Sequence, residues 1–231
     1  YSRQSGGFEM LKKFSTATAT TAAFNLQFRL VRRDHWLPVR NDTEGMNRDG
    51  FFPEYHNVYL DFYNVFNPLM SDSARSRHLG RFNLRMGRFY LPFGINLQTD
   101  THATVLQLSN DRNFGFDRDW YTGFYGSLTR DVNYDVYYLL GSGYYPRFEG
   151  QRGLFGARVS LGNRLLNEHG VEGGVAFMGG ERISHDAVMR SPSVAAKSPV
   201  SNIVRTLRLG LDGRYTHPLS SGTLAFTTEL S

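Results

Sequence analysis

Apolar and polar residues alternate along much of this chain, with the two-residue period of β-strands. In the stretch 133–143, Val136 and Tyr138 fall on one side of such a strand, whereas Asp135 and Tyr137 fall on the other. The pattern predicts nine strands, each with one apolar and one polar face: residues 17–33, 55–66, 80–90, 119–129, 133–143, 153–161, 170–180, 202–216 and 221–231. The function of the protein depends on what each of these two faces contacts.

No segment has the three- to four-residue period of an amphipathic helix. The best helical candidate, residues 11–20, is rich in Thr and Ala and reads equally well as the start of the first strand. Most of the predicted strands have about 10 to 13 residues, which exceeds the usual length of about 5 to 6 in globular proteins. Strands of this length can cross a bilayer at a tilt, whereas no run of apolar residues is long enough for a transmembrane helix.

The segments between the predicted strands alternate between long and short. Long polar loops follow the first, third and seventh strands, at 34–53, 91–118 and 181–201. Shorter links follow the second, fourth, sixth and eighth strands, at 67–78, 130–131, 162–169 and 217–220, and the link 144–151 is intermediate. An up-and-down meander places all the long loops on one rim, as outer-membrane barrels do. The sequence therefore predicts an all-β fold, an antiparallel up-and-down transmembrane β-barrel.

The number of predicted strands indicates that the barrel is incomplete. Single-chain bacterial barrels have an even number of strands, and nine is odd. An open sheet edge in lipid would leave backbone donors and acceptors without partners, at several kcal/mol each. The chain ends at Ser231, where such barrels usually carry an aromatic residue. We therefore expect residues 1–231 to form a single domain that is part of a larger barrel, with the remaining strands outside this chain.

Three stretches resemble a known family. They are G-R-F-Y-L-P-F-G-I-N-L-Q-T-D-T-H at 87–102, N-F-G-F at 113–116, and Y-D-V-Y-Y-L-L-G-S-G at 134–143. Together they resemble Gram-negative outer-membrane porin-like barrels, in particular the type encoded beside multihaem cytochromes, over roughly residues 80–156. The resemblance implies a β-barrel in the cell outer membrane that either passes solutes or surrounds an electron carrier. It implies no catalytic residues.

Composition and charge exclude several other classes. The chain has no cysteine, which rules out disulfides, a thiolate zinc site and covalent attachment of c-type haem, so no cofactor is expected. The net charge is +5, and only three of the 26 basic residues are lysines, at 12, 13 and 197. The arginines alternate with apolar residues along strands and do not gather with stacking aromatics on one exposed face, which argues against a nucleic-acid partner.

Charged residues of both signs fall on the polar faces of the predicted strands, where they would line the lumen of a barrel. The candidate lumen-lining residues are Arg29, Asp61, Arg81, Arg85, Asp135, Arg158, Glu172, Arg208, Asp212 and Arg214. In one interpretation the arginines form a cationic wall that favours anions. In the other, arginines and acids pair across neighbouring strands and stabilise the wall.

The longest loop, 91–118, holds a second group of candidate residues. Pro92, Phe93, Gly94, Asp100 and His102 would narrow the channel if the loop folds inward; otherwise it is a solvated external loop. The loop lacks the D-x-D-x-D-G frame of a calcium site, and no metal is predicted. No serine and histidine are placed one register apart on adjacent strands near the outer rim, so the chain is not predicted to be an enzyme.

These observations favour an outer-membrane porin or channel for small hydrophilic solutes, which would be anions if the arginines form a cationic wall. The alternatives are a barrel sheath that holds a periplasmic electron-transfer partner, such as a cytochrome, and a soluble β-sandwich binding module. The expected partners of a barrel are membrane lipid, lipopolysaccharide and identical subunits. Arg205 falls on the apolar side at a strand end, where it can reach lipopolysaccharide phosphate.

Overall fold

The computed structural model of the protein describes residues 2–17, 19–34, 50–71, 73–74, 79–94, 118–143, 146–162, 170–184, 202–220 and 222–230. Ten strands form one sheet in which each strand pairs antiparallel with its neighbours in sequence. The strands are β1 (Ser2–Ser15), β2 (Thr20–Asp34), β3 (Gly50–Phe62), β4 (Asn83–Tyr90), β5 (Arg118–Ser127), β6 (Val132–Leu139), β7 (Gly153–Leu161), β8 (Val171–Ile183), β9 (Ile203–Leu219) and β10 (Gly222–Leu230). A short 3₁₀-helix, η1 (Asn67–Leu69), follows β3. The expected all-β, antiparallel up-and-down architecture is confirmed.

The prediction of nine strands was wrong, because the sequence pattern missed β1. The alternation fails there at two adjacent pairs, Gly6–Gly7 and Lys12–Lys13. Even so, β1 pairs with β2 from Ser2 to Ser15. The segment 11–20 is thus the end of β1, a turn and the start of β2, and it is not a helix. Because ten is even, β1 and β10 run in opposite directions, and the argument from an odd number of strands no longer applies.

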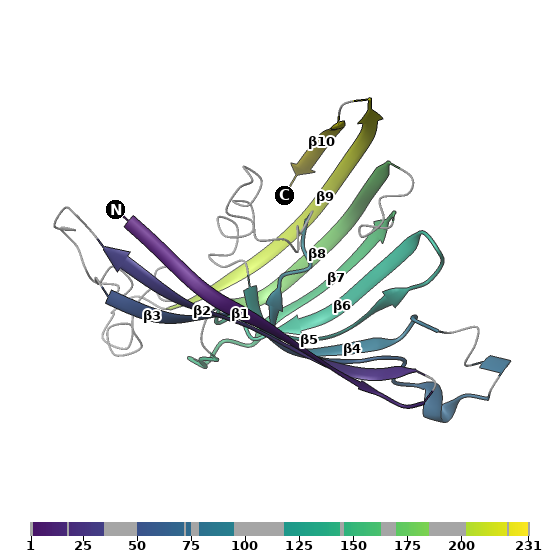
Figure 1. Cartoon of the computed structure of the whole chain (residues 1–231), viewed down its shortest axis with the longest axis horizontal. Coiled ribbons are helices and arrows are strands. Elements are labelled where there is room, and N and C mark those ends of the chain that lie inside the picture. The colour runs from purple at the N-terminus through teal and green to yellow at the C-terminus, as the bar shows by residue number, and fades with distance from the viewer. Residues whose placement is uncertain are drawn as a thin grey trace.

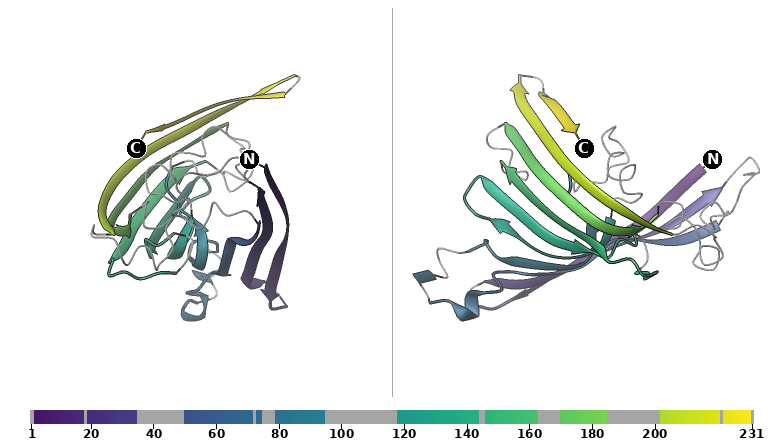
Figure 2. Two further views of the ribbon diagram at one scale, coloured as in Figure 1. Left: turned by 90° about the vertical axis from the view of Figure 1, so that its left-hand side faces the viewer. Right: turned by 180° about the vertical axis from the view of Figure 1, so that it is seen from behind.

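The sheet is strongly curved and open in the described part of the chain. Figure 1 shows the strands following one another around a concave surface, from β1 at the front to β9 and β10 at the top. Figure 2 shows the opening, with β10 on one side of it and β1 on the other. The two edge strands each pair with one neighbour, so the sheet has the curvature of a barrel wall without closure. Among the described residues, no helix has the length and apolarity to cross a membrane.

The connections divide between two rims, because consecutive strands run in opposite directions. Residues 35–49, 91–117, 140–152 and 184–202 connect strands at one rim, which we call the long-link rim. Residues 16–19, 63–82, 128–131, 162–170 and 220–221 connect them at the other, the short-link rim. The expected separation of long from short links is therefore present, except that the link 63–82 is long for its rim. Hydrogen bonds join the two ends of the link 63–82. Asn64 Oδ1 accepts a hydrogen bond from the Gly80 N–H (2.6 Å), and Asn83 Oδ1 accepts one from the Asn64 N–H (3.1 Å).

A buried carboxylate organises part of the long-link rim. Asp119, at the start of β5, accepts hydrogen bonds from the backbone N–H groups of Gly141 (2.5 Å), Ser142 (3.2 Å) and Gly143 (2.9 Å). Gly141 and Gly143 have φ values of +72° and +71°, which side-chain-bearing residues rarely adopt. The Gly141 carbonyl in turn accepts a hydrogen bond from the N–H of Ile183 (2.8 Å) at the end of β8. Asp119 therefore fixes a turn that also holds the end of β8.

The two faces of the sheet have opposite chemistry. On the convex face large apolar side chains are exposed: Phe155 by 55%, Val175 by 56% and Leu209 by 70%. On the concave face charged side chains are buried, with Arg158 and Asp61 exposed by only 2% and 3%. Water-soluble sheets rarely expose a row of large apolar side chains on one face while they bury charges on the other.

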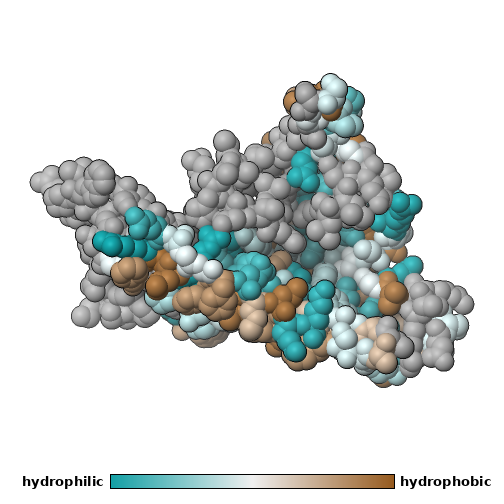
Figure 3. Space-filling model, in the orientation of Figure 1, coloured by the Kyte–Doolittle hydropathy of each residue, from teal (hydrophilic) through white to brown (hydrophobic). Residues whose placement is uncertain are grey.

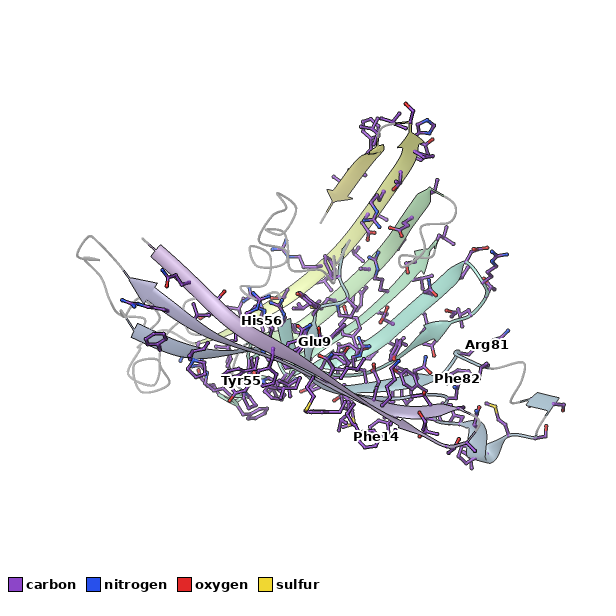
Figure 4. The ribbon with its side chains drawn as sticks, viewed as in Figure 1. Glu9, Phe14, Tyr55, His56, Arg81 and Phe82 are labelled. Atoms are coloured by element: carbon purple, nitrogen blue, oxygen red, sulfur yellow. The ribbon has the colours of Figure 1, made fainter. Side chains whose placement is uncertain are left out.

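The figures show the same division at the strands nearest the viewer. In Figure 4, Phe14 and Tyr55 lie beneath the sheet on its convex side, whereas Glu9 lies on the other side of β1. Figure 3 shows apolar side chains gathered along the front strands of this view. Aromatic rings continue from strand to strand on the convex face, with centroids 5.6 Å apart for Phe8 and Phe28 and 5.5 Å apart for Phe28 and Tyr55.

Candidate functional site on the concave face

The candidate site is the concave face, and its first element is an ion pair between β3 and β4. Arg85 stands directly opposite Asp61 in the register and donates from Nε to Oδ1 (2.7 Å) and from Nη2 to Oδ2 (2.8 Å). The guanidinium carbon lies 3.9 Å from the ring centroid of Phe89, 4.4 Å from that of Tyr59 and 4.8 Å from that of Tyr125. A forked contact stacked among aromatic faces is a geometry that arginine can form and lysine cannot.

A second ion pair passes over a strand. Arg158 on β7 extends across β8 and forms a forked contact with Asp212 on β9, donating from Nη1 to Oδ2 and from Nη2 to Oδ1 (2.6 Å). Both side chains are about 1% exposed. The guanidinium lies directly over Gly174 of β8, where any side chain would collide with it. A glycine on the intervening strand is therefore what allows this pair to form.

Further polar contacts extend this arrangement from β1 to β9. Glu172 stands opposite Arg214 in the register, and the carboxylate accepts a hydrogen bond from Arg214 Nη2. At the other end of the sheet, Asn25 Nδ2 donates to Glu9 Oε1 (2.7 Å) and Asn57 Nδ2 donates to Gln27 Oε1 (2.7 Å). We call this row of concave-face contacts the polar belt; it comprises Glu9, Asn25, Gln27, Asn57, Asp61, Arg85, Arg158, Asp212, Glu172 and Arg214.

The polar belt contains six of the ten candidate lumen-lining residues. Three of the predicted arginines, Arg85, Arg158 and Arg214, are neutralised by acids in the way that the pairing interpretation expects. Asp135 stands opposite Arg158 in the β6–β7 register, and Arg81 precedes β4, where its carbonyl accepts a hydrogen bond from the Tyr134 hydroxyl (2.6 Å). The two remaining candidates are arginines in strands, both with the concave-face parity: Arg29 on β2 and Arg208 on β9.

The segment after β4 lies against the concave face. Residues 91–94 are all buried, and Leu91 and Phe93 are fully so. Tyr137 on β6 donates a hydrogen bond from its hydroxyl to the Pro92 carbonyl (3.3 Å), and the Phe93 ring lies over Gly210 on β9, 2.8 Å from where a Cβ would stand. The segment 91–94 therefore lies on the inner side of the sheet and reaches β9 through the Phe93 ring, as an inward-folding loop would. Of the five residues predicted for a constriction, Asp100 and His102 lie outside the described residues.

The inward segment completes an apolar cluster on the concave face, between β4 and β9. Its members are Phe89, Tyr90, Leu91, Phe93, Tyr121, Tyr137, Leu139, Leu154, Ala176 and Met178, with Tyr59 packed against them. The rings of Tyr121 and Tyr137 are stacked, with centroids 5.6 Å apart, and Tyr137 lies across Gly156 of the next strand. The inner side of the sheet is thus filled over its middle strands rather than uniformly hydrated.

Neither a protein-family model nor a curated protein matches this chain. Its function has to be inferred from the geometry of the sheet. In the part of the chain that the structure describes, no group of three or more histidine, cysteine or acidic side chains is placed to hold a metal ion.

Two arginine clusters lie at the long-link rim. Arg205 and Arg208 were each predicted from the sequence, the first to reach lipopolysaccharide phosphate and the second to line the lumen, but neither was predicted as a member of a cluster. On the convex side, Glu181 lies between Arg205 (Nε to Oε1, 3.5 Å) and Arg152 (Nε to Oε2, 3.9 Å), and both arginine side chains are more than four-fifths exposed. On the concave side, Arg182 and Arg208 lie on neighbouring strands. Sequence reasoning missed Arg182 because it ended this strand at residue 180, although the alternation continues to 182.

Proposed function

We propose that this chain forms part of the wall of a transmembrane β-barrel in an outer membrane and lets small hydrophilic solutes pass. The observation that carries the proposal is the inverted distribution of side chains, with Leu209 and Phe155 exposed on the convex face and Arg158 buried on the concave face. An exposed apolar face that continues across the strands is stable in contact with lipid and costly in contact with water.

In this proposal the mechanism is passive. Neighbouring strands satisfy each other's backbone groups, lipid covers the convex face, and solutes pass along the concave face. The polar belt stabilises the wall, because each of its ion pairs joins two strands. The edges β1 and β10 each pair with a further strand, since an unpaired edge in lipid would leave a row of backbone groups without partners. The exposed cations Arg152 and Arg205 lie where the convex face meets the long-link rim, a position suited to lipid phosphates.

The proposal is tested by adding the purified protein to a planar lipid bilayer. We expect stepwise increases in conductance, and protein that remains in solution only with detergent. A folded monomer that is stable in buffer without detergent would contradict the membrane assignment and favour a soluble binding module. A protein that inserts but does not conduct would contradict the channel.

One observation favours a second candidate function, the barrel sheath. The apolar cluster around Phe93 fills the concave face over its middle strands, and a filled barrel holds something in place rather than passing solutes. The same bilayer experiment separates the two candidates, because a sheath inserts into lipid without conducting.

If the channel is open, Phe93 narrows it. Phe93→Ala removes the ring that lies over Gly210, so we expect a higher single-channel conductance than that of the unchanged protein. Leu69→Ala is the matched control: Leu69 is 84% exposed in η1 at the short-link rim, and its truncation should leave the conductance unchanged. An unchanged conductance in Phe93→Ala would show that the inward segment does not limit flow.

A further inference from the structure

Two arginines lie on the concave face toward the long-link end of β8 and β9. Arg182 shares its side of β8 with Glu172 and Met178, and Arg208 stands opposite Met178 in the register. Arg182 contacts Thr206 on β9, which lies two residues from Arg208 on the same face of that strand. Arg208 is exposed, and Arg182 is partly buried.

Arg182 is held in position by neutral groups. Its Nε donates to Thr206 Oγ1 (3.1 Å), and its Nη1 donates to the Ile183 carbonyl (3.2 Å). The backbone at this point is fixed as well, because the Ile183 N–H donates to the Gly141 carbonyl, in the turn that Asp119 holds. These contacts orient the guanidinium without neutralising its charge. Both are made by Nε and Nη1, so Nη2 takes no part in them.

Three other strand arginines on this face have acidic partners. Arg85, Arg158 and Arg214 each contact an acid on a nearby strand. No acid among the described residues forms an ion pair with Arg182 or Arg208; the adjacent Glu181 carboxylate contacts Arg152 and Arg205 instead. Two like charges on one face without a counter-charge repel each other, and an anion bound between them removes that cost.

We propose that Arg182 and Arg208 form a binding site for phosphate groups on the concave face. Guanidinium groups bind phosphate through forked, charge-assisted hydrogen bonds, and two arginines match a doubly charged tetrahedral anion better than a single chloride. Arg182 is preorganised by Thr206, and Arg208 is free to close on the anion. The site depends on the proposed function for its role, which is to select phosphate-bearing solutes at the mouth of the channel.

The position of the site suits that role. It lies between the long-link rim and the point where Phe93 covers Gly210, so a solute that enters from this rim meets the two arginines before it reaches Phe93. A local positive potential raises the concentration of anions at a channel entrance. Beyond the arginines the charges are paired, so the anion meets no further uncompensated arginine among the residues of the polar belt.

The test measures the binding of inorganic phosphate to the purified protein in detergent by isothermal titration calorimetry, at pH 8 and low salt. We expect saturable binding that Arg208→Gln weakens about tenfold or more, as expected for the loss of a charge-assisted contact. Arg208 has no hydrogen bond or ion pair in the described structure, so this substitution should leave folding intact. Arg182→Gln should weaken binding to a similar degree.

Lys12→Gln is the matched control, since it removes an exposed cation on the edge strand β1, away from β8 and β9. If the unchanged protein binds no phosphate, or if Lys12→Gln weakens binding as much as Arg208→Gln does, the site is refuted. Phosphate binding without conductance in a bilayer would uphold the site and refute the channel. Conductance without phosphate binding would uphold the channel and refute the site.

Discussion

Arg158→Met is expected to lower the free energy of unfolding by about 3–5 kcal/mol. The substitution leaves the Asp212 carboxylate about 1% exposed and without the guanidinium that neutralises it. An isolated buried charge is far more costly than a buried pair, which is why removing one partner has a large effect. The loss is measured as a shift in the urea midpoint of the protein refolded in detergent or lipid vesicles, followed by tryptophan fluorescence.

A double substitution and a surface substitution serve as controls. Arg158→Met with Asp212→Leu removes both charges and should recover most of the lost stability. Arg152→Met removes an arginine whose side chain is 85% exposed and should change the unfolding free energy by less than about 0.5 kcal/mol. If Arg158→Met were as stable as the unchanged protein, the buried pair would contribute nothing to the wall.

Leu209→Arg is expected to cost about 2–4 kcal/mol when the protein folds into lipid vesicles. Leu209 stands opposite Phe177, the central residue of β8, on the convex face, so in a barrel it lies near the middle of the bilayer. Arginine at that depth loses its hydration. In a water-soluble sheet the same position, 70% exposed, would accept arginine at almost no cost.

The comparison that decides between these outcomes is Leu69→Arg. Leu69 is 84% exposed but belongs to η1 at the short-link rim, outside the strands. If Leu209→Arg and Leu69→Arg have equally small effects on refolding into vesicles, lipid does not contact the convex face. A large effect at Leu209 alone identifies the face that lipid covers.

The alternation of apolar and polar residues was sufficient to predict nine of the ten strands, but not the shift in register between β2 and β3, which places Tyr55 and Val58 on the same face. β7 has the predicted bounds, and β4, β5 and β10 differ from them by three residues or fewer at each end. β1 was missed because its alternation is interrupted. Phe8, Met10 and Phe14 share one face, but Lys12 falls among them and Leu11 falls on the opposite face. Alternation identifies a strand only where it is unbroken over several residues.

The candidate site was less predictable than the fold. The parity of the strands placed Arg158 and Asp212 on one face, but it could not pair them, because the contact passes over a third strand and needs Gly174 there. Likewise the sequence suggested that the loop containing Phe93 folds inward, but not that its ring would lie on Gly210. Both contacts depend on the stagger of non-adjacent strands, which local pattern does not encode.

The uninterrupted order of the sheet has a consequence for how the protein forms. Every strand bonds only with the strands before and after it in the chain, so no pairing requires distant parts of the chain to meet first. Closing a short link costs less chain entropy than closing a long one, which favours growth by successive hairpins. At each stage the most recently added strand offers a free edge as a template for the next, and an assembly factor that recognises such an edge would find one from the first hairpin onward.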